Sequence, residues 1–180
     1  IWVKNRTSSG NTGDWMVGHK DLYGGSSPWN GYLVLNKTQQ QYNDNHPFNN
    51  YTPTSLDFQL NNWDRVNGNG SNYIAILFAS ANDADGNPIS KVGSYSGPGG
   101  VVTITTGFQP RFIMVKKANG AGGWHVFDTT RGMGSGNDPL LYLNTNGAQI
   151  TVDYVTPSST GWSTTSGNLS EGDYIYYAHA

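Results

Sequence analysis

Short apolar segments alternate with polar, turn-forming segments along the whole chain of 180 residues. The apolar segments are rich in Val, Ile, Leu, Tyr and Trp, and clusters of Gly, Asn, Ser and Pro separate them, which is the pattern of β-strands joined by turns. No window has apolar residues at the spacing i, i+3, i+4, i+7 without such a cluster interrupting it, so no helix is predicted. The expected strands are Ile1–Lys4, Trp15–Val17, Tyr32–Leu35, Leu56–Leu60, Tyr73–Ala79, Val101–Thr105, Phe112–Lys116, Trp124–Asp128, Leu140–Leu143, Gln149–Tyr154 and Tyr174–Ala178.

Six short phrases of the first half recur in the same order in the second half, with gaps that change by a few residues. The matched pairs are Ile1–Lys4 with Ile113–Lys116, Trp15–Val17 with Trp124–Val126, Leu33–Asn36 with Leu141–Asn144, Thr52–Ser55 with Thr156–Ser159, Phe58 with Trp162, and Tyr73–Ala75 with Tyr174–Tyr176. One or two such matches arise by chance, but six in order indicate two copies of one supersecondary unit. The sequence therefore predicts an all-β protein of two tandem, related antiparallel β-sandwich (jelly-roll-like) units.

The boundaries of these units follow from the turn-rich stretch between the copies. We expect a first β unit at 1–80, a linker at 81–94 and a second β unit at 95–180. Residues 95–110 read as a turn, a strand and a turn that lead into the strand at Phe112. The first copy starts at Ile1 without a counterpart of this hairpin, so we interpret it as truncated at its front.

Composition narrows the class of protein. Charged residues make up 12% of the chain, the net charge is −2 and no basic run occurs, which argues against a nucleic-acid partner. No apolar segment approaches the roughly 20 residues of a membrane-spanning helix. There is no cysteine, whereas Gly (24 residues) and aromatic side chains (13%) are abundant. A surface kept wet by amides and hydroxyls is typical of extracellular, fibrous or viral β-proteins.

The second copy resembles a repeat of tail-fibre and other virion proteins of tailed bacteriophages, in particular marine and cyanobacterial ones. The matching motifs are Tyr95-x-Gly97-x-Gly99, Gly107-Phe108-x-Pro110, Lys116, Phe127-Asp128 with Arg131-Gly132, and the closing strands at Tyr73–Ala75 and Tyr174–Ile175. Pro98 stands where the repeat has asparagine, and His19-Lys20-Asp21 replaces the Phe-Asp…Arg-Gly phrase in the first copy.

That resemblance implies a structural or adhesive component of the virion, in a tail fibre or appendage, and no enzymatic reaction. It also implies partners: other virion proteins, further copies of the chain in a homo-oligomer (a trimer first), and host cell-surface polysaccharide bound weakly by many copies. A spacer or decoration module that contacts only virion proteins is the alternative, and a polysaccharide depolymerase is the third reading.

The repeated phrases consist of apolar positions and turn residues, so they indicate packing. A buried Trp contributes a large contact area, and Trp15 and Trp124 open the second strand of each copy, so we expect both to be core anchors. Asp128 and Arg131 are spaced to form a local ion pair that holds a loop; a sugar contact is the functional alternative.

The surplus of aromatic residues is the best functional indication. Trp2, Trp29, Trp63, Trp162 and the Tyr-rich end exceed the needs of two small cores. Exposed rings beside amides hold sugars, so we expect a glycan site at Trp29, Asn30 and Trp63. Trp29 as a loop anchor, and aromatic side chains buried in an oligomer interface, stay open as alternatives.

The residues for catalysis or metal binding are sparse. A glycosidase needs two facing carboxylates, but Glu171 is the only Glu, and no motif joins Asp14, Asp128 and Asp138. We therefore predict no enzyme and no cofactor. The Asn82–Pro88 stretch resembles the start of a calcium loop through Asp83, Asp85 and Asn87, without the closing Glu. An Asp-Gly turn explains it better, and a weakly held structural calcium ion is the alternative.

Overall fold

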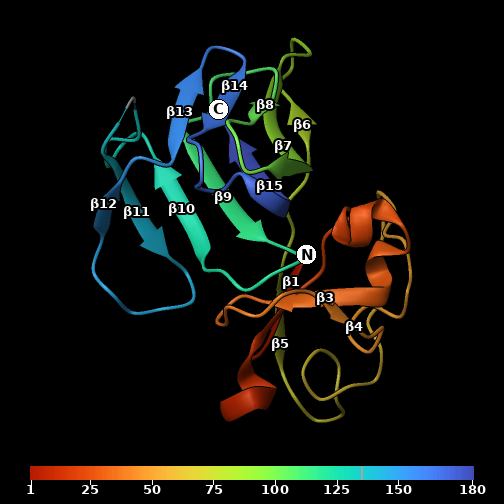
Figure 1. Ribbon diagram of the computed structural model, residues 1–180. Helices are drawn as coiled ribbons and strands as arrows, with labels where there is room; N and C mark the ends of the chain where they lie inside the picture. Colours follow the sequence, from red (N-terminus) through yellow and green to blue (C-terminus); the bar gives the residue numbers. More distant parts are fainter. Residues whose placement is uncertain (135) are drawn as a thin grey trace. The chain divides into compact units, whose positions relative to one another are not determined.

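The computed structural model describes residues 1–134 and 136–180 (Figure 1). The chain divides into two compact units, Ile1–Leu77 and Phe78–Ala180, which are described separately. Strands hold 39% of the residues and helices 6%, so the prediction of an all-β protein is confirmed. The helical residues form three short 3-10 turns, Gly10–Gly13, Leu22–Gly25 and Pro28–Asn30.

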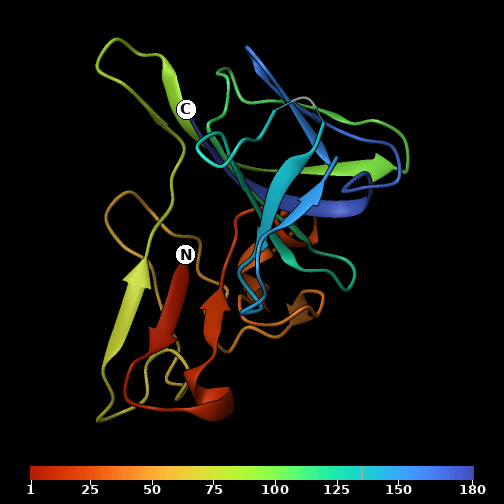
Figure 2. The same ribbon diagram turned by 90° about the vertical axis from the view of Figure 1, so that its left-hand side faces the viewer.

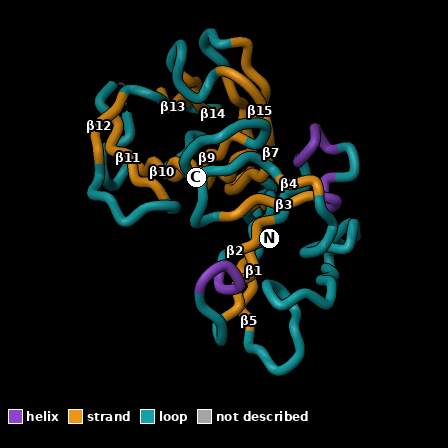
Figure 3. The backbone as a smooth tube through the Cα atoms, turned by 60° about the horizontal axis from the view of Figure 1, so that its bottom comes forward, coloured by secondary structure: helices purple, strands orange, loops and turns teal. Residues whose placement is uncertain are grey.

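The first unit has one antiparallel sheet of five strands in the order β4-β3-β2-β1-β5. Its strands are β1 (Trp2–Asn5), β2 (Trp15–Val17), β3 (Gly31–Val34), β4 (Tyr42–Asn43) and β5 (Tyr73–Ile76). The loops between β4 and β5 are the longest stretch without regular structure, and Figure 3 shows them as teal tube beside the strands of this unit. The expected strand Leu56–Leu60 lies in this stretch and does not form.

The inner face of this sheet is covered by turns and loops instead of a second sheet. Val3, Met16 and Val34 lie side by side on it through the pairs Val3↔Met16 and Met16↔Val34. Trp29, Phe48 and Val66, which come from a 3-10 turn and the long loop, close the core over them. Residues 1–77, all of which the structure describes, are therefore not a two-sheet sandwich, because the Asn- and Pro-rich segment 36–72 covers the core with anchored loops.

Close packing of the Trp29 and Phe48 rings requires a glycine directly after β2. A Cβ atom on Gly18 would lie 2.7 Å from the Trp29 ring and 2.9 Å from the Phe48 ring. The two rings meet edge to face with centroids 5.8 Å apart, a favourable aromatic geometry.

The second unit has two antiparallel sheets. The larger has the order β12-β11-β10-β9-β15-β7-β6, and the smaller has the order β13-β14-β8. The strands are β6 (Ala81–Asn82), β7 (Pro88–Pro98), β8 (Thr103–Thr105), β9 (Phe112–Lys117), β10 (Trp124–Asp128), β11 (Asp138–Tyr142), β12 (Ile150–Val152), β13 (Val155–Ser158), β14 (Gly161–Thr164) and β15 (Glu171–His179). Figure 2 shows the long strands β7 (green) and β15 (dark blue) running beside each other.

The core of the second unit lies between these two sheets. The small sheet contributes Ile104, Val155 and Trp162, and the large sheet contributes side chains that include Val115 and Phe127. Trp162 is fully buried, with its ring edge to face against Tyr95 and Tyr176. This unit is a β-sandwich whose two layers meet at aromatic side chains.

Four strands of each unit share strand order and register. The Lys4↔Trp15 pair of β1–β2 corresponds to Lys116↔Trp124 of β9–β10, and Lys4↔Ile74 corresponds to Lys116↔Ile175. The pairs Met16↔Val34 and His125↔Tyr142 correspond in the same way. Equivalent hydrogen bonds link the start of β2 to the residues after β3, and the start of β10 to the residues after β11. The Trp15 N–H donates to Asn36 Oδ1 at 3.1 Å, and the Trp124 N–H donates to Asn144 Oδ1 at 2.8 Å. Four of the six repeated phrases thus occupy equivalent places in the two sheets, whereas Thr52–Ser55 and Phe58 lie in a loop and their partners Thr156–Ser159 and Trp162 lie at β13 and β14.

Residues 81–94, expected to be a linker, form part of the second unit. β6 and β7 pair as a hairpin there, with Ala81 opposite Ser90. Asp83 caps the turn, since its Oδ1 accepts the N–H groups of Asp85 at 3.0 Å and Asn87 at 2.8 Å. Gly86 adopts φ +87°, which glycine allows without strain. The turn residues belong to this hairpin, and it continues into the longest strand of the sheet.

A buried histidine makes the second unit sensitive to acid. The pKa of His125 is lowered from 6.5 to about 4, mainly by burial among Tyr142, Tyr154 and Phe127; hydrogen bonds to the backbone of Val115 and Gly123 oppose this shift, and the charge of Lys116 adds to it. The folded state therefore holds His125 neutral, whereas the unfolded state gains a proton below pH 6.5. We expect the free energy of unfolding to fall as the pH drops from about 6.5 to 4, by at most about 3 kcal/mol.

His125→Phe isolates this contribution because it retains an aromatic ring without the titration. Denaturant unfolding of wild type and variant at several pH values measures it. The other titrating groups are common to both proteins and cancel in the difference. Parallel pH profiles between pH 4 and 6.5 would contradict the assignment.

Candidate functional site

Trp29 is part of the core and cannot bind a sugar as expected. It is 6% exposed and packs against Phe48 in the cluster that includes Val3 and Met16. Pro28 and Asn30 flank it in a 3-10 turn that points the ring inward. The loop-anchor alternative is the one that the structure contains, because burying an indole ring stabilises a loop more than solvent exposure does.

A cluster of aromatic rings instead reaches the surface at the β3–β4 edge of the first sheet. Tyr32 in β3 and Tyr42 in β4 are register partners, and their rings stack with centroids 4.9 Å apart and planes 14° apart. Tyr32 is buried in the core, whereas Tyr42 is 37% exposed. One face of the Tyr42 ring therefore rests on Tyr32, and part of the ring is exposed to solvent.

Trp63 extends this cluster from the long loop. Its ring meets Tyr32 edge to face at 6.0 Å and lies 5.7 Å from the ring of His46. The Arg65 guanidinium carbon lies 4.9 Å from the Trp63 ring centroid, a cation–π contact. Tyr32, Tyr42, His46, Trp63 and Arg65 are together called the aromatic patch. Trp63 was expected at a glycan site, and the structure places it here with Arg65 over its ring.

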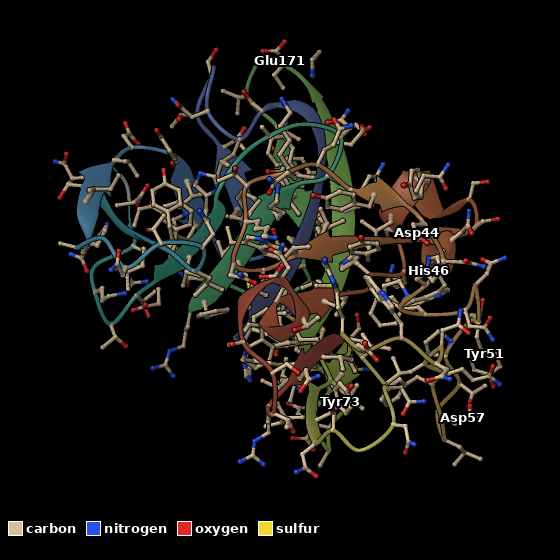
Figure 4. All side chains as sticks on the ribbon, turned by 90° about the horizontal axis from the view of Figure 1, so that it is seen from below. Asp44, His46, Tyr51, Asp57, Tyr73 and Glu171 are labelled. Carbon is tan, nitrogen blue, oxygen red and sulfur yellow. The ribbon has the colours of Figure 1, made fainter. Side chains whose placement is uncertain are left out.

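Hydrogen-bonding side chains border the aromatic patch. Asn30 Nδ2 donates to Asn43 Oδ1 at 3.0 Å, which places Asn30 beside β4. Asp44 accepts a hydrogen bond from the backbone N–H of His46 at 3.0 Å and also pairs with the His46 ring. Figure 4 shows Asp44 and His46 next to each other, and Tyr51 close to Asp57 on the same loop region. Rings with amides and a carboxylate at their rim provide both the apolar and the polar contacts that a sugar requires.

A buried carboxylate holds the cationic side of the patch in place. Asp14 is 4% exposed and lies 2.6 Å from Lys37 Nζ and 3.8 Å from an Arg65 nitrogen. Asn36 Nδ2 also donates to it at 2.7 Å. Burial raises the pKa of Tyr32, the charge of Asp44 adds to this, and the charge of Arg65 opposes it. The patch is therefore linked to a fixed ionic network, and Asp14 is one of its supports.

The expected anchors differ in their surroundings. Trp124 is buried, but Trp15 is only half-buried and lies on the sheet face opposite Met16, because neighbouring residues of a strand point to opposite faces. Trp15 packs edge to face against Trp2, with Lys4 Nζ 5.8 Å from its ring. Trp15 is thus not an anchor of the core, since Val3 and Met16 fill that place.

The Asp128–Arg131 pair is present and closes a tight loop. Arg131 Nε donates to Asp128 Oδ2 at 2.5 Å, the Arg131 backbone N–H donates to Oδ1 at 2.8 Å, and the guanidinium also reaches the Val126 carbonyl at 3.1 Å. Burial alone would raise the pKa of Asp128, but the hydrogen bonds and charge of Arg131 lower it overall. Both oxygens of the Asp128 carboxylate thus accept hydrogen bonds from Arg131 within the loop.

The remaining acidic residues are also in structural contacts. Asp138 is fully buried and accepts backbone N–H groups of Gly134, Tyr154 and Val155. Asp83 is committed to the β6–β7 turn with Asp85 and Asn87, so the calcium candidate is a hairpin turn. In the described part of the chain, no group of three His, Asp or Glu side chains gathers as metal ligands would.

Sequence reasoning missed Tyr42 and His46, the two most exposed rings of the patch. The segment 36–46 is polar and has no clear alternation, so nothing in it predicted that Tyr42 would pair with Tyr32. Of the remaining surplus, Trp162, Tyr174 and Tyr176 are buried in the second core, whereas Trp2 and Tyr177 are half-buried.

Comparison with known proteins adds a family but no activity. Among the residues that the structure describes, no helix has the length and apolar character needed to span a bilayer. The searches of curated proteins and of solved structures give no match to the chain. A family model described as a domain of unknown function (DUF7483) matches residues 1–180. The chain therefore belongs to the DUF7483 family.

Proposed function

We propose that this chain is an adhesive module of a phage virion that binds a cell-surface glycan weakly through the aromatic patch. The observation that carries the binding proposal is the Tyr42 ring, which is stacked on Tyr32 on one side and 37% exposed. An ordered ring loses little conformational freedom when a sugar stacks on it. Asn30, Asn43 and Asp44 at the rim supply partners for hydroxyl groups.

The assignment to a virion follows from the resemblance of the motifs to tail-fibre repeats. The shared register of β1, β2, β3 and β5 with β9, β10, β11 and β15 supports the further proposal that the two units are tandem copies of one module. The first copy then keeps the sheet and replaces the second layer of a jelly-roll-like sandwich by loops. Multivalency would raise a weak single-site affinity, because linked sites bind at a high effective concentration.

Tyr42→Ala tests the proposed site. We expect it to weaken glycan binding roughly tenfold, which equals about 1.4 kcal/mol, because the stacking surface is lost while Tyr32 stays buried. A glycan array identifies a ligand for the wild-type chain, and calorimetry with that ligand measures the change. Trp29→Ala is unsuitable because it removes part of the core.

Tyr51→Ala is the matched control, because Tyr51 is a partly exposed Tyr of the same unit outside the patch. Equal losses in both variants would show that the patch is not the site. Failure of the wild-type chain to bind any surface polysaccharide would favour the spacer function, in which the module contacts only virion proteins.

A further inference from the structure

The β5 edge of the first sheet has no strand paired to it among the described residues. β5 pairs with β1 on one side and ends the strand order β4-β3-β2-β1-β5. Ile74 is 42% exposed and Leu77, directly after the strand, is 60% exposed. The run from Tyr73 to Ser80 contains no charged residue and no proline, so the charges and prolines that often protect an edge strand are missing.

The second unit shows what occupies the equivalent edge. β15 takes the place of β5, and on its other side it pairs antiparallel with β7 over nine residue pairs, Glu171↔Pro98 to His179↔Ser90. Because Tyr73 and Ile74 match Tyr174 and Ile175, the edge of β5 corresponds to the part of β15 that pairs with Tyr95 and Ser94. In the second unit, a further antiparallel strand, β7, therefore fills the position that is open beside β5 in the first unit.

The backbone N–H and C=O groups that β5 turns to its open edge are at positions equivalent to those that β15 turns to β7. The Arg6 N–H donates to the Asn72 carbonyl at 2.7 Å, as the Ala118 N–H donates to the Asp173 carbonyl at 2.7 Å. Since successive residues of a strand point their N–H and C=O groups to alternate sides, Ile74 and Ile76 face β1. Tyr73 and Ala75 therefore face the open edge, as Tyr174 and Tyr176 face β7.

Side chains define the pattern of a fitting strand. Tyr95 of β7 stacks on Tyr174 with ring centroids 5.0 Å apart. Tyr73 is held for a similar contact, because its hydroxyl donates to the Asp64 carbonyl at 2.8 Å and accepts the Gly68 N–H at 2.7 Å. An extended segment with an aromatic residue opposite Tyr73 and small residues beside it fits this edge.

We propose that the open edge of β5 binds one further antiparallel strand with the pattern of β7, an extended segment with an aromatic residue opposite Tyr73 and small residues beside it. The interaction is β-strand addition, in which main-chain hydrogen bonds give affinity and the aromatic contact gives register. It does not depend on the glycan site, because Tyr42 lies on β4 at the opposite edge of the sheet.

A fluorescent peptide with the sequence of residues 88–98 tests the proposal against the complete 180-residue chain. We expect a saturable increase in fluorescence anisotropy that fits one peptide per chain. Ala75→Pro should weaken this binding at least tenfold, because proline removes the outward N–H while the pairing with β1 through Ile74 and Ile76 remains. Circular dichroism of the variant checks that it is folded.

A second peptide, with proline in place of Gly93, tests the same edge without changing the protein. It should not bind, because Gly93 pairs with Tyr176 in the second unit and Ala75 occupies the position equivalent to Tyr176. Binding that survives Ala75→Pro in a folded variant, or equal binding of both peptides, overturns the proposal. So does an absence of binding at millimolar peptide. Self-association of the wild-type chain in sedimentation that Ala75→Pro abolishes but an excess of the 88–98 peptide leaves intact would also overturn it, because something other than a β7-like strand would then occupy the edge.

Discussion

Trp162→Ala is expected to destabilise the second unit by about 3–5 kcal/mol, the range for removal of a buried Trp side chain. Trp162 is fully buried in β14 and contacts Tyr95 and Tyr176 edge to face at 5.5 and 6.2 Å. It therefore joins the small sheet to β7 and β15 of the large one. The alanine variant loses these contacts and leaves a cavity between two layers that strand pairing holds apart.

Guanidinium denaturation followed by far-UV circular dichroism measures this loss. Val101→Ala is the matched control, because Val101 is an exposed residue of the same unit and its loss should change stability by less than about 0.5 kcal/mol. Trp162→Phe should cost less than the alanine variant, since the indole Nε1 has no hydrogen-bond partner in the described residues. An alanine variant as stable as the control would show that the two sheets do not share a core.

The second large effect is expected from Asp138→Ala. The Asp138 carboxylate is fully buried and accepts the N–H groups of Gly134 at 3.2 Å, Tyr154 at 3.1 Å and Val155 at 3.0 Å. Removing it leaves one buried and two part-buried donors without their acceptor, and each buried unsatisfied group costs about 1–3 kcal/mol. We expect a loss of at least about 3 kcal/mol in the free energy of unfolding, measured in the same denaturation experiment.

Two further variants complete the experiment: one is an exposed-site control, and the other separates the hydrogen bonds that Asp138 accepts from its negative charge. Asp153→Ala removes an exposed carboxylate from the same region and should change stability little. Asp138→Asn retains one acceptor oxygen and should fall between wild type and Asp138→Ala. If Asp138→Asn and Asp138→Ala lose equal stability, the negative charge is responsible and the count of accepted N–H groups is not.

The residues that the two halves share explain how much of the fold could be predicted. Alternation and turn residues placed β1, β2, β9 and β10, because these strands are short, apolar and bounded by Gly and Asn. The matched phrases Leu33–Asn36 and Leu141–Asn144 each end at an Asn, and only the structure shows that Asn36 and Asn144 accept the backbone N–H of Trp15 and Trp124. The strand expected at Leu56–Leu60 does not form, because residues 54–57 make a turn in which Leu56 is 95% exposed, and only Leu60 packs against the core of Trp29, Phe48 and Val66.

The candidate site could be predicted only in part. Composition indicated that aromatic side chains serve a purpose beyond the core, and Trp63 and Asn30 lie in and beside the aromatic patch. Trp29 and Trp162 were indistinguishable from Trp63 in the sequence, because a Trp in a turn-rich segment has the same local signature whether it points inward or outward. Which of them is buried depends on neighbours such as Gly18 that approach from distant positions.

The sequence by itself determined that the chain is all-β, that short apolar phrases recur in order in its two halves, and that Asp128 and Arg131 are spaced for a local pair. Each of these depends on residues within a few positions of one another or on a repeated order. Only the tertiary structure decided which face of each strand is buried, that Tyr42 stacks on Tyr32, and that β5 ends its sheet unpaired while β15 is covered by β7. Those outcomes arise from contacts between residues far apart in the chain, which no local pattern encodes.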